Sequence, residues 1–512
     1  MTVRNRKATD DEILRAVKEC KDYKSASKIL GIAVQTIKNR MRLIRQKQPE
    51  EPRPNTYKHS SVKRYFVSSV VSDAPIDKKL YKTIRTLCNH LDAQEVYIPV
   101  QYDWQIERQG KHEPNYPSIL KDLLLSDDIS LNKHLNIMGS VPIHATIQNP
   151  LTGMKHVSNN KSAIFGHPQR AMESIPTQKD HIPKLLYTTG AITQPRYTRS
   201  KAGRKSRDFH TMGGLIIEVS RSRFHVFMVT GNKDGSIYHL NNKYDGDKIT
   251  SENVSAIYMA DEHSEFYPLD VKKATYLNKD SLVKMLKPEV VIRGDVYNHG
   301  SDSHHGRNNV LERIVRADNE RFSVKRELDE CFDHIQETTI GDTKNVIVAS
   351  NHHDHLKRWL NEYNPHHGDP RNAYLYHHLN AQMIENAMAL KTTSVDPFEI
   401  YCRSNYRELW SKTTFVGRDE EYKVSGVSVD MHGDIGPNGA RGSAVNLSLG
   451  GQPVTIGHGH SPRVYRNVHQ VGVSAKEMGY NKGYSGWLTT HDIIYKDGNR
   501  TLVHLINGKW QI

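Results

Sequence analysis

Four short runs rich in valine and isoleucine end directly before polar, metal-binding side chains, and this feature constrains the fold more than any other. The runs cover residues 254–260, 290–293, 345–349 and 453–456. Runs of this length and composition are typical of strands buried in a sheet. In open α/β sheets, ligands gather beyond the carboxyl ends of the strands. The pattern therefore predicts an α/β fold in which segments distant in the sequence meet at one site.

The polar segments supply oxygen and imidazole ligands. Together with one separate histidine they are Asp261-Glu262-His263, Gly294-Asp295, Asn351-His352, His432 and Gly457-His458-Gly459-His460. Such ligands suit Mn²⁺, Zn²⁺ or Fe better than Ca²⁺. In a chain with 29 histidines any one segment could be a turn or a solvated loop, but five in this order are difficult to obtain by accident. We interpret the set as a centre for two cations, roughly 3.5–4 Å apart, that hydrolyses a phosphodiester.

The order of these segments resembles the pattern of the calcineurin-like metallophosphoesterases, which is Asp-x-His, Gly-Asp, Gly-Asn-His-Asp/Glu, His and Gly-His-x-His. The resemblance covers about residues 251–470, and it implies a β-sandwich flanked by helices. It also implies the ligands of two ions, which are Asp261, His263, Asp295 and His460 for one and Asp295, Asn351, His432 and His458 for the other. Asp295 would bridge the ions, and His352 would act near the leaving oxygen as a general acid or a transition-state contact.

Three positions depart from this family pattern. Ser264 matches it only loosely, and Ser350 replaces the usual glycine before Asn351. His353 stands where an acid is common, with Asp354 one place later. Such outer residues orient the ligating histidines and influence which metal is preferred. Mn²⁺ is expected, with Mg²⁺, Zn²⁺ or Fe as alternatives.

Further histidines cluster near these segments, and for most of them we favour a place on the polar surface. They are His299, His304, His305, His353, His355, His366, His367, His377 and His378. His304 and His305 follow Asp295 in a loop of Gly, Asp, Ser and His residues. These two are the exception, as candidates for substrate contact.

Residues 1–47 predict a helix-turn-helix domain. Thr9-Asp10-Asp11-Glu12 is a capping box that opens an amphipathic helix. Gly31 supplies the turn, and Ile29, Leu30, Ile37 and Met41 are predicted to lock the helices together. The side chains predicted to enter a DNA major groove are Gln35, Thr36, Lys38, Asn39 and Arg40, with Arg42 and Arg45 on phosphates. The alternative is a small three-helix domain that binds protein or oligomerises.

Residues 48–60 contain three prolines among polar neighbours and predict a linker. Residues 61–250 predict an accessory, non-catalytic α/β domain. It would contain a β-α-β unit over 64–71, 77–91 and 95–100, and paired strands over 213–219 and 224–229. The β-α-β unit could be a degenerate copy of the catalytic architecture.

The densest basic stretch of the chain also lies in this domain. It contains Arg196, Arg199, Lys201, Arg204, Lys205 and Arg207. A flexible loop of this composition can follow a DNA backbone, and a solvated surface loop is the alternative. Residues 471–512 predict a β-hairpin that closes the catalytic core of residues 251–470 beside His458 and His460.

The composition favours a polyanionic partner. The chain has 512 residues and a net charge of +14, from 71 Lys+Arg against 57 Asp+Glu. No apolar run approaches the roughly 18–20 residues that span a bilayer, and no secretory signal opens the chain. Four scattered cysteines indicate a reducing compartment. We expect a soluble, cytoplasmic protein with no membrane contact.

These features together indicate a metal-dependent DNase. The resemblance extends to SbcD-type DNA exonucleases and to metallophosphoesterases encoded by bacteriophages, which implies a phage DNA-degrading or DNA-processing enzyme in the host cytoplasm. The alternatives are a phosphomonoesterase or cyclic-nucleotide phosphodiesterase, an RNase, and a DNA-binding regulator with an inactive phosphoesterase domain. We expect DNA as partner and a homo-oligomer, a dimer or higher, because a helix-turn-helix commonly reads DNA in pairs.

Overall fold

The computed structural model describes residues 8–20, 22–47, 62–102, 114–158, 160–179, 181–304, 306, 309–476 and 478–512. The chain divides into two compact units, Met1–Ser60 and Ser61–Ile512. The linker predicted over 48–60 and the candidate His305 lie outside the described residues, as do the side chains of Arg42 and Arg45.

The first unit is helical, as predicted. Its helices are α1 (Asp10–Cys20), α2 (Tyr23–Leu30) and α3 (Val34–Lys47). The capping box is present, because Glu12 N donates to Thr9 Oγ1 and Thr9 N donates to the Glu12 carboxylate. Gly31 ends α2 with a positive φ of 66°, which glycine adopts without strain. Ile37 is buried as expected, but Ile29 is 68% exposed and does not lock the helices.

A six-stranded sheet carries the predicted strands of three metal-binding segments. Its order is β17 (Thr413–Val416), β16 (Lys344–Val348), β15 (Val290–Arg293), β14 (Ala256–Tyr258), β24 (Thr490–Ile494) and β25 (Arg500–His504). The first four strands are parallel. The hairpin β24–β25 joins them antiparallel to β14, so the predicted closing hairpin belongs to the same sheet.

A ten-stranded sheet carries the remaining segments. Its order is β18 (Lys423–Val424), β19 (Val427–Ser428), β20 (Val454–Ile456), β22 (Val468–Gln470), β21 (Arg463–Tyr465), β6 (Ala171–Ile175), β8 (Lys184–Thr188), β5 (Ser162–Phe165), β4 (Leu135–Met138) and β3 (Ile129–Ser130). A four-stranded sheet has the order β10 (Phe224–Thr230), β9 (Gly213–Val219), β1 (Lys63–Val71) and β2 (Ala93–Val100).

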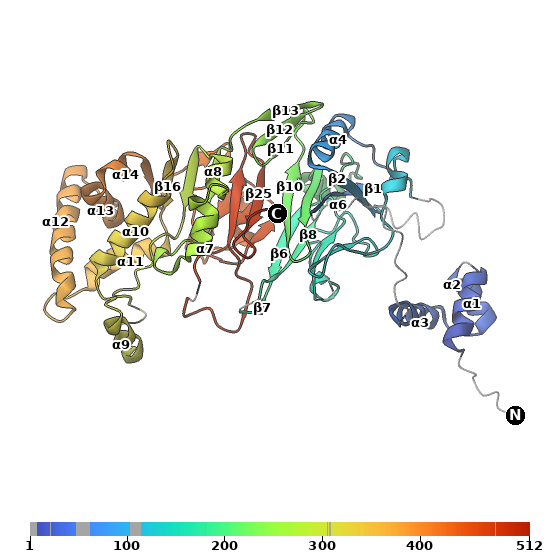
Figure 1. Ribbon diagram of the computed structural model, residues 1–512, viewed down its shortest axis with the longest axis horizontal. Coiled ribbons are helices and arrows are strands. Elements are labelled where there is room, and N and C mark those ends of the chain that lie inside the picture. The colour runs from blue at the N-terminus through green and yellow to red at the C-terminus, as the bar shows by residue number, and fades with distance from the viewer. Residues whose placement is uncertain are drawn as a thin grey trace. The chain divides into compact units, whose positions relative to one another are not determined.

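The smaller sheets both pack on the ten-stranded sheet. Val346 and Val427 share one apolar cluster between β16 and β19, and Val67 and Ile164 share another between β1 and β5. β10 lies alongside β25, where Met228 N donates to Thr501 Oγ1 at 2.8 Å. The four-stranded and six-stranded sheets therefore lie edge to edge and face the ten-stranded sheet in a sandwich (Figure 1).

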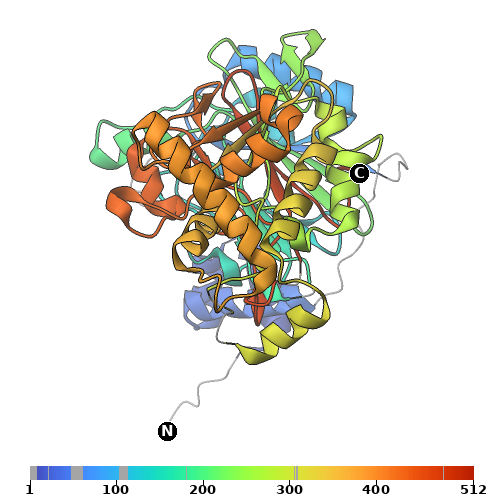
Figure 2. The ribbon, with the colours of Figure 1, turned by 90° about the vertical axis from the view of Figure 1, so that its left-hand side faces the viewer.

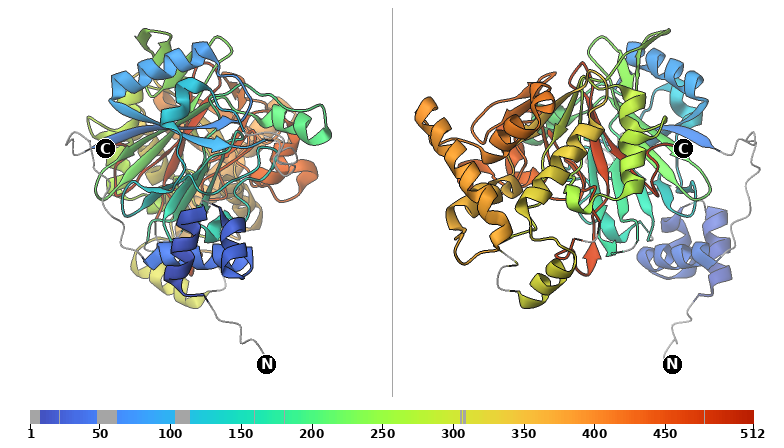
Figure 3. Two further views of the ribbon diagram at one scale, coloured as in Figure 1. Left: turned by 90° about the vertical axis from the view of Figure 1, so that its right-hand side faces the viewer. Right: turned by 60° about the vertical axis from the view of Figure 1, so that its left-hand side comes forward.

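Helices cover the outer faces of the sandwich. The helix α4 (Lys78–Leu91) lies across the four-stranded sheet (Figure 3), between the parallel strands β1 and β2 of the predicted β-α-β unit. The helices α7 (Leu269–Lys272) and α8 (Leu282–Leu286) cover the six-stranded sheet. A helical group packs beside β16, with α12 outermost (Figure 2). Its members are α10 (Val324–Thr338), α11 (Asn351–Glu362), α12 (Ala373–Leu390), α13 (Pro397–Asn405) and α14 (Arg407–Ser411).

The remaining elements are short. They are α6 (Lys201–Phe209), α9 (Val310–Asp318), α15 (Ala444–Leu447), a sheet of β11 (Ile237–His239), β12 (Asn242–Asp245) and β13 (Lys248–Ser251), and the pair β7 (Thr177–Gln178) and β23 (Tyr484–Ser485).

The helix α6 corrects the prediction of a flexible basic loop. Ser200 caps this helix by accepting from Gly203 N. Gly203 suggests a loop in the sequence, but a Cβ there would lie 2.3 Å from Thr198 O, so close packing explains the glycine.

The predicted domain divisions at 250 and 470 are also corrected. β21 from the predicted catalytic core pairs with β6 from the predicted accessory domain. β14 pairs with β24, which lies beyond residue 470. Because backbone hydrogen bonds cross both divisions, residues 61–512 form one compact unit.

Candidate metal centre

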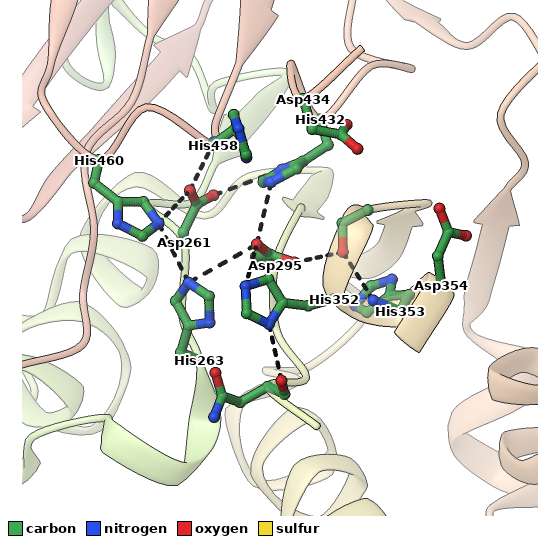
Figure 4. Close-up of polar contacts among 12 residues, drawn as sticks. Asp261, His263, Asp295, His352, His353, Asp354, His432, Asp434, His458 and His460 are labelled. Atoms are coloured by element: carbon green, nitrogen blue, oxygen red, sulfur yellow. Dashed lines mark hydrogen bonds and ion pairs between the residues drawn. The ribbon is translucent and has the colours of Figure 1, made fainter. Parts of the chain in front are cut away.

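The five predicted segments meet in one place. β14, β15 and β16 are parallel neighbours, so their carboxyl ends open at the same edge of the six-stranded sheet. Asp261, Asp295 and Asn351 follow these ends. His263 also follows β14. His432 follows β19, and His458 and His460 lie in the loop after β20, so these three histidines come from the facing sheet. Figure 4 shows Asp261, His263, Asp295, His432, His458 and His460 converging from two sheets, and Asn351 lines the cleft beside them.

Asp295 lies at the middle of the cluster and is 1% exposed. Its Oδ2 is 3.2 Å from His432 Nε2 and 3.8 Å from His263 Nε2. It is also 3.8 Å from His352 Nε2. Asp295 belongs to two groups of potential ligands whose atoms lie within 4.8 Å of one another, one with His263 and His352, the other with Asp261 and His432. Its place between the two groups suits a bridging ligand.

Asp261 faces the histidines of the last segment. Its Oδ2 lies 3.3 Å from His460 Nε2 and accepts a hydrogen bond from His458 N at 2.7 Å. His460 Nε2 is also 3.3 Å from His263 Nε2. A Cβ at Gly457 would lie 2.3 Å from Asp261 Oδ1, so only glycine allows this close approach.

Three ligating residues of the cluster have left-handed backbones. The φ angles of His263, His458 and His460 are 40°, 62° and 56°. A left-handed conformation at a non-glycine residue costs of order 1–3 kcal/mol and persists where the surrounding structure imposes it. Three of the seven predicted ligands therefore have a strained backbone, although residues elsewhere in the chain share this conformation.

Several buried atoms of the predicted ligands lack hydrogen-bond partners. They are Asp261 Oδ1, Asn351 Oδ1, and both ring nitrogens of His432. Buried polar atoms are almost always hydrogen-bonded, because leaving one unsatisfied costs about 1–3 kcal/mol. Unpartnered carboxylate, amide and imidazole atoms that converge on one point fit divalent cations. The residues present therefore suit the predicted metals.

The charges of the cluster are strongly coupled. Burial raises the pKa of Asp295, but His352 and His432 lower it more, to well below its usual range. Burial holds the pKa of His263 well below its usual range, so its imidazole is neutral and can donate a lone pair. For His432, the carboxylates of Asp295 and Asp261 outweigh burial and raise the pKa to about 9. Metal binding would displace that proton.

The surroundings of Ser350 and His353 explain two of the three departures from the family pattern. Ser350 caps α11 by accepting from His353 N, and its hydroxyl donates to Asp295 Oδ1. The serine therefore supports the predicted bridging carboxylate. His353 points away from the cluster and stacks on Phe398, with ring centroids 4.5 Å apart. Burial lowers the pKa of His353 to about 3.

His352, unlike His353, faces the cluster. Its Nδ1 lies 2.8 Å from Asn298 O. A carbonyl oxygen only accepts hydrogen bonds, so Nδ1 carries a hydrogen and Nε2 is directed towards Asp295. The ring of His352 meets that of His263 edge to face, at 4.8 Å between centroids.

Glu262 lies beneath the cluster rather than in it. Its carboxylate is 2.6 Å from Arg293 Nη1, accepts from Tyr276 at 2.7 Å and is 3.2 Å from His334 Nε2. Glu262 and Arg293 are both fully buried. This network ties β14 and β15 to α10 below the predicted ligands.

A cleft of about 990 Å³ opens beside the cluster and is lined by Asp295 and His352. His355 and three residues without a recognised motif, Arg441, Ser443 and Gln470, complete its lining. Tyr480 and Trp487 also line it. The ring of Trp487 meets that of His460 edge to face at 4.4 Å, so the closing segment supports His460 as expected. No local signal predicts the polar lining, because α11, the loop before α15 and β22 each contribute to it.

The other histidines have different surroundings. His366, His367, His377 and His378 are exposed, as predicted. His299 is buried and bonded to Tyr297 at 2.8 Å, which corrects its predicted surface position. The ring of His304 lies 4.8 Å from that of His355, a cleft residue.

The predicted DNA contacts of the first unit lie mostly on one exposed surface. Gln35, Thr36, Lys38 and Asn39 are exposed on α3. Arg40 differs from them, because it forms an ion pair with Asp10 and donates to Ala8 O. Its guanidinium group therefore ties α3 to the start of α1.

The predicted basic contacts of the second unit are exposed on or beside α6. They are Arg196, Arg199, Lys201, Arg204, Lys205 and Arg207. Arg196 Nη1 donates to Asp73 O at 2.6 Å, and Arg207 Nη2 donates to Tyr197 O at 3.3 Å. Arg199, Lys201, Arg204 and Lys205 present their charges to solvent.

The fold and site define a mixed α/β protein with a buried aspartate–histidine cluster that suits metal ions. The chain is similar to a bacteriophage protein over most of its length. It is 28% identical over 465 residues to Protein A1 of Escherichia phage T5, a match that covers 88% of this chain and 83% of that protein. No protein-family model matches the chain, and no solved structure matches it. Within the described residues, none of the helices has the length and apolar character to cross a membrane.

Proposed function

We propose that this protein is a metal-dependent DNase that hydrolyses DNA phosphodiester bonds at a centre of two divalent ions, preferably Mn²⁺. Its role would be to degrade or process DNA in the host cytoplasm during phage infection. The observation that carries the proposal is the convergence of buried, unpartnered ligand atoms around Asp295. Divalent cations held by these atoms would supply the positive charge that promotes hydrolysis of an anionic phosphodiester.

The predicted ligands would hold the ions in the arrangement that the family resemblance implies. Asp261, His263, Asp295 and His460 would hold one, and Asp295, Asn351, His432 and His458 the other. When bound, such ions supply Lewis acidity and an activated water. Ser350 keeps the Asp295 carboxylate in place through its hydroxyl.

His352 would transfer a proton to the leaving oxygen. Its Nδ1 donates to Asn298 O, so the proton to be transferred would be carried by Nε2, which faces the cleft. Donation from Nε2 neutralises the alkoxide as the phosphorus–oxygen bond breaks. The carbonyl of Asn298 keeps the ring in this orientation throughout.

Three observations support DNA as the substrate. The four polar side chains on α3 are exposed together, as a recognition helix requires. The basic side chains on α6 are exposed as well, and the chain carries a net charge of +14. The likeness to a phage protein is consistent with a role in phage DNA metabolism.

We also propose that the protein forms a homo-oligomer. Val310, Leu311, Ile314 and Val315 of α9 are each more than half exposed. So are Ile384 and Met388 of α12. Exposed apolar groups of this kind are typical of surfaces that associate.

The test of the DNase proposal is incubation of the purified protein with linear and circular DNA, with Mn²⁺, Mg²⁺ or a chelator. We expect cleavage with Mn²⁺ that the chelator abolishes, and loss of the linear form alone would identify an exonuclease. Parallel reactions contain RNA or a small aryl phosphate. Turnover of the aryl phosphate without cleavage of DNA would instead identify a phosphomonoesterase, and preference for RNA would identify an RNase. No turnover of any substrate would favour the DNA-binding regulator.

A further inference from the structure

A second pocket, separate from the metal cleft, gathers three arginines. It has a volume of about 440 Å³, and its guanidinium groups belong to Arg170, Arg466 and Arg500. No Asp or Glu is among the described residues that line it. None of its lining residues lines the metal cleft. The pocket therefore concentrates positive charge at a place with no role in the proposed metal chemistry.

Arg170 is buried, at 7% exposure. Its Nη2 donates to Val229 O at 2.7 Å, and its Nη1 donates to Thr230 Oγ1. Its Nε is buried without a hydrogen-bond partner. Both partners are uncharged, and burial lowers the pKa of Arg170 to about 10. A buried cation without a counter-charge is unfavourable, so an anion bound beside Arg170 would stabilise it.

Arg466 and Arg170 lie just beyond the end of a strand pair. Tyr465 of β21 pairs with Ala171 of β6 in antiparallel register, and each arginine is the next residue of its chain segment. Both arginines line the pocket. The Nε of Arg466 is also buried without a partner. The Arg466 guanidinium lies 4.8 Å from the ring centroid of Phe209, the last residue of the basic helix α6.

Arg500 adds a third cation and connects the pocket to the metal-binding strand. Its Nη1 donates to Thr455 Oγ1 of β20 at 3.0 Å, and its Nη2 donates to Asn467 O at 2.7 Å. The carboxylate that acts on Arg500 is Asp492. Asp492 already accepts from Thr455 at 2.7 Å and lies 3.0 Å from His469 Nδ1, so it is shared among several donors.

We propose that this arginine pocket binds a phosphate group. Guanidinium groups match the geometry of phosphate oxygens, and a phosphate would offset the charges that Arg170 and Arg466 bring together. A DNA backbone or free phosphate offers the same chemistry. Because Arg466 packs on the end of α6, a bound phosphate would lie next to the exposed basic side chains of that helix.

The experiment measures phosphate binding by calorimetry, with the full chain in the presence of a chelator, since metal ions in the cleft would bind phosphate too. Arg466→Gln should weaken the binding of inorganic phosphate about tenfold or more, because a charged hydrogen-bond donor is lost. Arg466→Lys should restore part of the affinity. The matched control is Arg463→Gln, which removes the same charge from β21 outside the pocket and should leave affinity unchanged.

A short thymidine oligonucleotide distinguishes the two sources of phosphate. If Arg466→Gln weakens the oligonucleotide and inorganic phosphate alike, the pocket binds a DNA backbone. If it weakens inorganic phosphate alone, the pocket binds free phosphate. The proposal is overturned if the native protein shows no saturable phosphate binding, or if Arg466→Gln and Arg466→Lys both bind like the native protein. Thermal melting of each variant shows whether it is folded. Neither arm involves metal ions or catalysis, so failure here leaves the DNase proposal standing.

Discussion

At the scale of single residues, adjacent histidines have opposite surroundings. His352 is held by Asn298 O and faces the predicted ligands. His353 is buried against Phe398 on the other side of the same helical turn. Successive residues of a helix point about 100° apart, so the first turn of α11 directs only one of them into the cleft.

This difference predicts the effect of His352→Gln. The variant should keep its metal occupancy, because His352 is not among the proposed ligands. Its turnover of DNA should fall by about 10²–10⁴-fold, the usual contribution of a general acid. Metal content by atomic absorption and initial cleavage rates check both expectations. The matched control is His377→Gln on the exposed surface of α12, which should behave as the native protein. Equal loss of metal and activity in His352→Gln would make His352 a ligand instead.

The support from Ser350 is another residue-scale feature, and the sequence alone could not predict it. In the sequence, Ser350 is only a departure from the family glycine. In the structure, its hydroxyl reaches Asp295, 55 positions away along the chain. Contacts at such separation depend on how the strands are ordered in the sheet. Local patterns of residue type carry no information about that order.

At the scale of elements, the buried pair of Glu262 and Arg293 ties the carboxyl end of β14 to β15. Arg293 Nη2 also donates to Thr338 Oγ1 of α10 at 2.8 Å. Burial would raise the pKa of Glu262, but Arg293, followed by His334 and Tyr276, outweighs it and lowers the pKa well below the ordinary value of 4.5. The ionised pair therefore holds three elements together under the metal cluster.

We predict that Glu262→Gln lowers the free energy of unfolding by about 3–5 kcal/mol at neutral pH, because it leaves Arg293 buried without its counter-charge. The folded-state pKa of Glu262 is depressed, so its stabilisation is complete above 4.5 and is lost as the pH falls through the folded value. The difference between native and variant proteins should therefore shrink below pH 4.5. Urea unfolding at neutral and acidic pH measures this. A difference that is independent of pH would contradict the assigned ionisation.

The elements themselves were predicted with mixed success, and the reasons are physical. The runs before Asp261, Asp295 and Asn351 are strands, as expected, because short apolar β-branched runs suit a buried sheet. The basic stretch was expected to be a loop because it contains Gly203. That glycine lies inside α6, where the chain at Thr198 passes too close for a side chain. A packing constraint of this kind leaves no signal in the local sequence.

At the scale of the whole molecule, the sheets are built from both halves of the second unit. A domain boundary is predicted at residue 250, because the predicted metal-binding motifs begin after it. However, β21 pairs with β6 in a sheet that also contains β3, β4, β5 and β8. The order of strands in a sheet follows from tertiary pairing, which periodicity does not encode. Cleft residues such as Arg441 and Gln470 were missed for the same reason.

This architecture predicts that residues 251–470 do not fold alone. The fragment lacks β24, the antiparallel partner of β14, and β6, the partner of β21. Its exposed sheet edges would favour aggregation. By contrast, a chain without residues 1–47 should fold and should still hydrolyse a small phosphodiester, while its affinity for DNA falls. Circular dichroism and gel filtration compare the two products. A soluble, cooperatively unfolding fragment of residues 251–470 would restore the predicted boundaries.

The number of Mn²⁺ ions bound per chain tests the central claim most directly. Isothermal titration of the chelator-treated protein should give two ions for the native chain. Asp295→Ala should bind neither ion tightly, because Asp295 would bridge both. The variant should still fold, which thermal melting reports. A native protein that binds no Mn²⁺, or an Asp295→Ala variant that still binds two ions with native affinity, would contradict the account.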